Sequence, residues 1–127
     1  MSRVVLDASA LLALLNAEPG AEQVAKALGD GVISAVNLAE VVAKLSEHGM
    51  PDEMIHQSVG GLGLEVHPFD TELAYLAGLL RRPTRAHGLS LGDRACLALG
   101  LHLALPVLTA DKAWATLKVG VKVRVIR

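Results

Sequence analysis

Residues 88–111, GLSLGDRACLALGLHLALPVLTAD, decide the fold of this chain. Ser90 is a good helix N-cap, and Asp93 three residues later completes a variant of the capping box. The run Leu91–Ala104 is rich in Ala and Leu, which predicts an almost wholly buried helix. The proline that follows ends this helix, and Val107–Leu108 then predicts a short buried strand. The stretch therefore predicts a helix and a strand that both belong to the core.

The rest of the chain alternates short apolar runs with helical ones. Strands are predicted at residues 3–6, 32–33, 64–66 and 119–126. Helices are predicted at residues 10–16 with Ser9 as N-cap, 21–28, 36–48 with Ser34 as cap, 52–59 and 71–80. Because short strands separated by helices are typical of α/β domains, we expect a mainly parallel sheet. No repeat or linker divides the chain, so one domain over residues 1–127 is expected.

The composition limits the class of protein. Of the 127 residues 52% are hydrophobic, yet there is only one Phe, one Tyr and one Trp, so Ala, Leu and Val must build the core. No apolar run approaches the roughly 18 residues of a membrane span, and no secretory signal is visible. A single cysteine, Cys96, rules out an internal disulfide. The cytoplasm is therefore the expected compartment.

The charge balance bears on possible partners. The formal net charge is −1, from 12 Lys and Arg against 13 Asp and Glu, which argues against strong nonspecific binding of nucleic acid by the whole chain. If one metal ion holds four of the acids, 12 cations face 9 anions over the remaining surface. The total charge then understates how positive that surface is.

Three acids lie at predicted junctions between strands and helices. Asp7 follows the first strand, Asp111 follows the strand at 107–108, and Asp93 lies in the first turn of the buried helix. In open parallel sheets, ligands bind beyond the carboxyl ends of the strands. Asp93 and Asp111, each taken alone, are also explained as helix caps.

A fourth acid, Glu40, borders the apolar face of the helix at 36–48. A surface pair with Lys44 is its ordinary explanation, worth about 0.3–0.5 kcal/mol. If the four acids instead converge, each like-charged pair at roughly 5 Å costs about 3 kcal/mol at an effective dielectric near 20. Such an arrangement needs protons or a cation to offset the repulsion. Carboxylate oxygens suit Mg²⁺ or Mn²⁺, which can activate water for phosphodiester hydrolysis. The hydroxyl groups of Ser9, Ser34 and Thr109 could hold the carboxylates, although N-capping explains them equally well.

Four stretches resemble the motifs of the PIN-domain ribonucleases of the VapC-type toxin group. They are VVLDASALLALL at 4–15, ISAVNLAEVVAKL at 33–45, GLSLGDRACLALG at 88–100 and VLTADKAW at 107–114. Each is weak alone, but together they follow the family's order and spacing over nearly the whole chain. The resemblance assigns the family's acids to Asp7, Glu40, Asp93 and Asp111, and its Ser/Thr positions to Ser34 and Thr109.

The same resemblance implies a fold, a cofactor and partners. The fold is a three-layer α/β/α domain with a five-stranded parallel sheet. The activity is cleavage of single-stranded or loop RNA at an acidic site that holds Mg²⁺ or Mn²⁺. The partners are a second copy of the chain in a homodimer and a cognate antitoxin that silences the enzyme.

A basic loop precedes the helix that carries Asp93. It holds Arg81, Arg82, Arg85 and His87, and Arg94 lies one residue after Asp93. These cations are candidates for contact with RNA phosphates, because an acidic pocket alone repels a polyanion. The alternative for the loop is a solvated surface. Arg94 could also orient a carboxylate or simply be exposed to solvent.

Two other functions are compatible with parts of the pattern. A phosphatase of the haloacid-dehalogenase type also has an Asp after its first strand, but it needs a second acid two residues later, where this chain has Ser9. A module that binds RNA without cleaving it could use the same fold. The four intact acids argue against that module.

Overall fold

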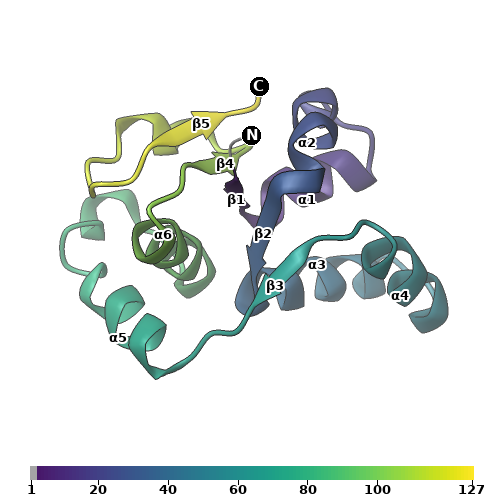
Figure 1. The fold of residues 1–127 in the computed structure, drawn as a ribbon, viewed down its shortest axis with the longest axis horizontal. Helices are drawn as coiled ribbons and strands as arrows, with labels where there is room; N and C mark the ends of the chain where they lie inside the picture. The colour runs from purple at the N-terminus through teal and green to yellow at the C-terminus, as the bar shows by residue number, and fades with distance from the viewer. Residues whose placement is uncertain (1–2) are drawn as a thin grey trace.

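A five-stranded parallel sheet forms the middle layer of the computed structural model, which describes residues 3–127 (Figure 1). The strand order is β3-β2-β1-β4-β5, and all four pairings are parallel. The strands are β1 (Val4–Leu6), β2 (Gly31–Ser34), β3 (Glu65–His67), β4 (Val107–Thr109) and β5 (Val123–Val125). The predicted parallel sheet is confirmed, and the last strand is an edge strand that is shorter than the predicted run at 119–126.

Helices cover both faces of this sheet. They are α1 (Ala8–Leu15), α2 (Ala21–Ala27), α3 (Ala35–Glu47), α4 (Asp52–Gly60), α5 (Thr71–Leu79) and α6 (Leu91–Leu103). Three short 3-10 turns are η1 (Leu28–Asp30), η2 (Arg85–His87) and η3 (Lys112–Thr116). In Figure 1, α5 and α6 lie on one side of the sheet and the first four helices on the other. The predicted three-layer arrangement is therefore confirmed, and none of the described helices is long and apolar enough to cross a membrane.

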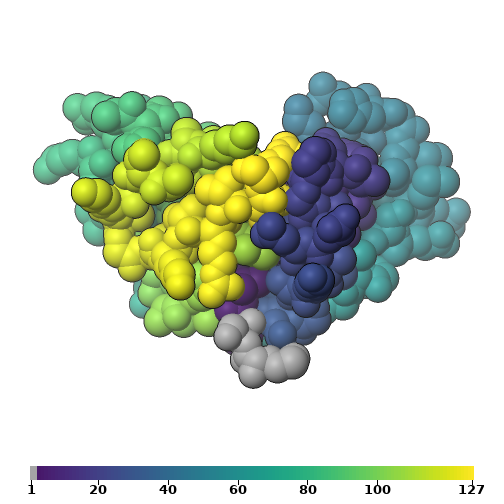
Figure 2. Space-filling view, turned by 90° about the horizontal axis from the view of Figure 1, so that it is seen from above, coloured from purple at the N-terminus to yellow at the C-terminus, as the bar shows by residue number. Residues whose placement is uncertain are grey.

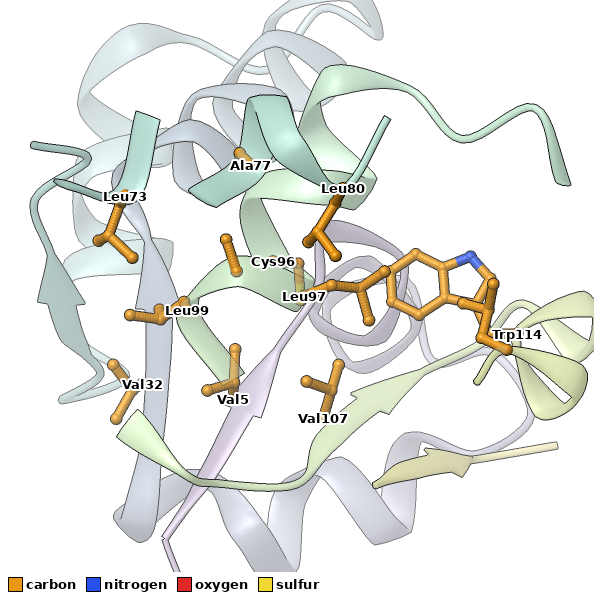
Figure 3. Close-up of a cluster of buried hydrophobic side chains, with 12 residues drawn as sticks. Val5, Val32, Leu73, Ala77, Leu80, Cys96, Leu97, Leu99, Val107 and Trp114 are labelled. Atoms are coloured by element: carbon orange, nitrogen blue, oxygen red, sulfur yellow. The ribbon is translucent and has the colours of Figure 1, made fainter. Parts of the chain in front are cut away.

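Alternation along the strands divides the core between the two faces. Val5, Val32 and Val107 pack with α5 and α6, where Trp114 and Cys96 complete the cluster shown in Figure 3. The neighbouring strand residues face α1 to α4 instead. The α6 helix is buried almost throughout, as its Ala-rich and Leu-rich sequence predicts. Because α6 is anchored in the core, the position of its first turn, which carries Asp93, is fixed.

The start of α1 differs from the prediction. The helix begins at Ala8, and its N-cap is Asp7, whose Oδ1 accepts a hydrogen bond from the Ala10 N–H at 2.8 Å. The prediction that Ser9 caps this helix is wrong. Because β1 ends at Leu6, only Asp7 is left to join the strand to the helix, and Ser9 lies inside the first turn.

Candidate active site

Asp7 is the best-defined member of the candidate site. It follows β1, beside the end of β4, and only 5% of its surface is exposed. Its Oδ2 accepts a 2.5 Å hydrogen bond from the Thr109 hydroxyl, and its Oδ1 accepts one of 2.8 Å from the Ser9 hydroxyl. Ser9 and Thr109 thus hold Asp7 in place, as proposed from the sequence.

The same hydroxyl groups tie Asp111 to this junction. The Thr109 Oγ1 accepts a hydrogen bond from the Asp111 N–H at 3.1 Å, and the Ser9 Oγ accepts one from the Ala110 N–H at 2.9 Å. The Asp111 side chain is exposed and caps η3 by accepting from the Ala113 N–H at 2.9 Å. The backbone at Asp111 is therefore fixed beside Asp7, while its carboxylate is engaged locally.

Asp93 opens α6 in the predicted capping box. The Ser90 hydroxyl accepts from the Asp93 N–H at 3.1 Å, and Asp93 Oδ2 accepts from the Ser90 N–H at 3.0 Å. The capping prediction is confirmed. A cap does not preclude a second role, because Asp93 is half-buried and its charge raises the pKa of Asp7.

Glu40 reaches the start of α6 from the middle of α3. Its Oε1 accepts a 2.8 Å hydrogen bond from the amide of Asn37, and the same amide donates to the Gly92 carbonyl oxygen at 2.9 Å. The Glu40 carboxylate lies directly against Gly92, where a Cβ would overlap it. Within residues 3–127, Lys44 forms no ion pair with Glu40. The ordinary explanation of Glu40 as half of a surface pair is therefore wrong.

Burial dominates the electrostatics of the site, and like charge adds to it. Burial raises the pKa of Asp7 from 3.8 to about 6, against the opposing effect of its hydrogen bonds to Thr109, Ala10 and Ser9, and the charge of Asp93 raises it further. Burial also raises the pKa of the Cys96 thiol well above its usual range, with Asp7, Asp93 and Glu40 contributing by their charge. These three carboxylates therefore lie within electrostatic reach of one buried sulfur atom.

No protein cation offsets this negative charge within the described chain. The close ion pairs of residues 3–127 join Arg3 to Glu65 and Arg127 to Glu18, and a looser one joins His102 to Glu72. In that range, no three Asp, Glu, His or Cys side chains lie together in a way that could hold a metal ion as they stand. The acids nevertheless have the chemistry that a hard divalent cation prefers, because every donor is an oxygen and buried Asp7 forms no ion pair within residues 3–127.

Other sequence candidates divide into those that face solvent and those that do not. The side chains of Arg81, Arg82, Arg85 and His87 are exposed, and His87 Nε2 lies 3.3 Å from the Thr116 hydroxyl of η3. The Ser34 hydroxyl accepts from the Val36 N–H at 3.2 Å, so its predicted cap is confirmed. Its contact with a carboxylate is not observed among the described residues.

Arg94 requires a correction. Only 9% of its surface is exposed, and its Nη1 donates to the Ala77 carbonyl oxygen near the end of α5 at 3.0 Å. The side chain thus joins α6 to α5 and satisfies a carbonyl at a helix end. We therefore remove Arg94 from the proposed phosphate contacts.

Sequence reasoning missed two residues of the site. Asn37 holds Glu40, and Gly92 leaves the space that Glu40 occupies. Asn37 gave one local signal, since it is a polar residue on the apolar face of its helix, three residues before Glu40. Gly92 gave none, because its role depends on a contact with a helix about fifty residues away.

The surface is hollowed between two lobes. Figure 2 shows a notch between the lobe drawn in green and teal, which carries α5 and the basic loop, and the blue lobe, which carries α3 and α4. The acids come from the elements on both sides of the sheet. Glu40 belongs to α3, whereas Asp93 belongs to α6.

Comparison with solved structures shows where this fold occurs. The chain is similar to one from a toxin–antitoxin complex of Klebsiella pneumoniae, with 19% identity, a TM-score of 0.78 and 98% of each chain covered. It is similar to a chain of DNA-bound VapBC from Salmonella typhimurium, with 20% identity, a TM-score of 0.77 and full coverage of both chains. It also matches VapBC-1 of nontypeable Haemophilus influenzae at 17% identity and a TM-score of 0.74, with 97% of each chain covered.

The sequence itself supports the assignment to a family. No curated protein has a sequence that matches this chain. The family model for the PIN domain matches residues 4–119, which include Asp7, Glu40, Asp93 and Asp111. The chain therefore belongs to the PIN domain family, whose members are typically nucleases.

Proposed function

We propose that this protein is a metal-dependent endoribonuclease and the toxin of a toxin–antitoxin pair. The observation that carries the proposal is the buried carboxylate of Asp7, which forms no ion pair within residues 3–127 and whose pKa the charge of Asp93 helps to raise. A buried carboxylate that no cation pairs with in the part of the chain the structure describes is suited to a cationic ligand. Membership of the PIN domain family argues against the alternative of a haloacid-dehalogenase-type phosphatase.

The residues proposed to hold Mg²⁺ or Mn²⁺ are Asp7, Glu40, Asp93 and Asp111. When bound, the ion would activate water and neutralise charge on the phosphodiester. Thr109 and Ser9 hold the Asp7 carboxylate through their hydroxyl groups. Two of these acids cap short turns or helix ends through one oxygen, which leaves the other oxygen of each carboxylate for a ligand.

Millimolar Mg²⁺ or Mn²⁺ is expected to raise the melting temperature, and EDTA to reverse the rise. The ion binds only the folded chain, which stabilises it by about 2.7 kcal/mol at a hundred times the dissociation constant. Cleavage of single-stranded RNA should depend on the same ions, and Ca²⁺ should support it poorly. Melting curves and cleavage assays over a metal titration test this. A melting temperature unmoved by either ion, with cleavage persisting in EDTA, would refute the metal site. A metal-stabilised protein that cleaves no RNA would favour the silent RNA-binding module.

The substrate surface is proposed to include the basic loop at 81–87. Arg81, Arg82 and Arg85 are exposed there, close in sequence to the start of α6. The contact of His87 with Thr116 joins this loop to η3, the turn that Asp111 caps. Cations beside the acids would attract an RNA backbone that the acids themselves repel.

Replacing Arg81, Arg82 and Arg85 together with Ala is expected to weaken RNA binding and to reduce its salt dependence. Each phosphate contact that is lost should lower the slope of log affinity against log salt by about 1. The rate at saturating RNA should change much less, because the acids are untouched. Cleavage rates over a range of RNA concentrations at two salt levels separate these effects. A loss of maximal rate at unchanged affinity would show that the loop shapes the catalytic site instead.

The proposed partners follow the resemblance and the structural matches. One similar structure is described as a toxin–antitoxin complex, two as VapBC, and another as a member of the VapBC family of toxin–antitoxin systems. These descriptions support a protein antitoxin as the regulator of this chain. A homodimer in the cytoplasm is the proposed working form. Co-expression with the product of an adjacent reading frame, followed by a cleavage assay, tests the antitoxin.

A further inference from the structure

We infer that Asn37 is a positioning residue that fixes the Glu40 carboxylate against the first turn of α6. The inference rests on the proposed function, because it concerns the same group of acids. Asn37 is 1% exposed, so it cannot itself be a surface contact for RNA. Asn37 can therefore affect metal binding or cleavage only through the residues that its side chain holds.

The side-chain amide of Asn37 joins two helices. Its Nδ2 donates to Glu40 Oε1 at 2.8 Å within α3 and to the Gly92 carbonyl oxygen at 2.9 Å in α6. An amide nitrogen has two hydrogens, and both are used. One end of this clamp is the carboxylate, and the other is the backbone one residue before Asp93. Asn37 therefore sets the position of Glu40 relative to Asp93.

Packing alone does not explain an amide at this position. The buried residues of α3 are Asn37, Val41 and Leu45, spaced by four, so Asn37 occupies the first place in an apolar stripe. A leucine there would bury more apolar surface and would carry no unpaired polar atom of its own. The Oδ1 of Asn37 is buried without a hydrogen-bond partner in the described residues, which adds a further penalty. The asparagine at this position therefore lowers stability but supplies a hydrogen-bond donor with a fixed orientation.

The orientation matters because Glu40 is a flexible side chain. With Oε1 held by Asn37 and the carboxylate lying against Gly92, the acid is restricted to one place before any ligand arrives. A ligand then need not pay the rotamer entropy of ordering Glu40. Partners that orient a metal ligand in this way typically change metal affinity or activity by about 10–100-fold.

The test compares Mn²⁺ binding to metal-free protein by calorimetry in four chains: wild type, Asn37→Leu, Glu40→Gln and the double variant. Asn37→Leu is expected to weaken Mn²⁺ binding at least about 10-fold while its melting temperature stays level or rises. In the double variant the loss should equal that of Glu40→Gln alone, because Asn37 acts only through Glu40. Asn37→Ala is measured beside it, so that one chain without the amide is available if the other does not fold.

A matched control separates positioning from general stability. Leu45→Ala, two turns along the same stripe, should lower the melting temperature and leave Mn²⁺ affinity unchanged. If either folded Asn37 variant binds Mn²⁺ as wild type does, or if the losses of the single variants simply add, the inference is overturned. Wild-type protein that binds no Mn²⁺ would instead overturn the proposed function, and Asp7→Asn in the same experiment shows that the binding measured is at this site.

Discussion

Asp7→Asn is expected to abolish RNA cleavage and, at the same time, to stabilise the metal-free protein at pH 7. The carboxylate is buried and lies near the charge of Asp93, which is why its pKa is raised from 3.8 to about 6. A shift of this size corresponds to about 3 kcal/mol of cost when Asp7 is ionised. An asparagine keeps the shape and can cap α1, but it has no charge with which to hold a cation. Thermal melting and a cleavage assay on the same preparation measure both effects.

The stabilisation should depend on pH in a defined direction. Because the folded state binds the proton more tightly than the unfolded state, the wild-type chain carries no penalty below about pH 3.8. The penalty grows as the pH rises to about 6 and is complete above it. The advantage of Asp7→Asn should therefore be full at pH 7 to 8 and should vanish towards pH 4. An equal advantage at both ends of this range would point to altered packing instead.

Asp70→Asn is the matched control for this variant. Asp70 is also a helix N-cap, since its Oδ1 accepts from the Leu73 N–H of α5 at 3.0 Å, but it is exposed and lies outside the site. Because asparagine caps as well as aspartate, its replacement should leave stability and cleavage nearly unchanged. Full cleavage activity in purified Asp7→Asn protein would remove Asp7 from the proposed chemistry.

The local features of this fold could be predicted from the sequence. The capping box at Ser90 and Asp93, the buried α6 and the short apolar strands depend on residues a few positions apart, and all are confirmed. One local prediction failed at Ser9, because Asp7 and Ser9, two residues apart, compete for the cap. The bounds of β1 decide that competition, and the sequence marks them only to within a residue or two.

The features that failed prediction depend on contacts between distant helices. Arg94 was a candidate for phosphate contact or for simple exposure to solvent, yet the packing of α5 on α6 buries it against Ala77. For Glu40, the surface pair with Lys44 was the ordinary alternative to a site role, and instead the carboxylate meets Gly92. No periodicity within one helix carries this information, because it is a property of how α3, α5 and α6 meet at the end of the sheet.

Gly92→Ala is expected to lower metal-dependent RNA cleavage about 100-fold while the protein stays folded. A methyl group at this position would occupy the space of the Glu40 carboxylate, and the end of a flexible side chain is what gives way. Displacing a reacting group by about 1 Å can cost that much in rate. Gly78→Ala, in α5, is the control because its Cβ would meet open space, so the substitution should stabilise by up to about 1 kcal/mol and leave the rate unchanged. Cleavage rates and melting curves of the two variants distinguish the cases. Equal rates would show that the position of Glu40 does not matter to catalysis. An unfolded Gly92→Ala chain would show that the close approach of Glu40 to Gly92 serves the packing of α3 on α6.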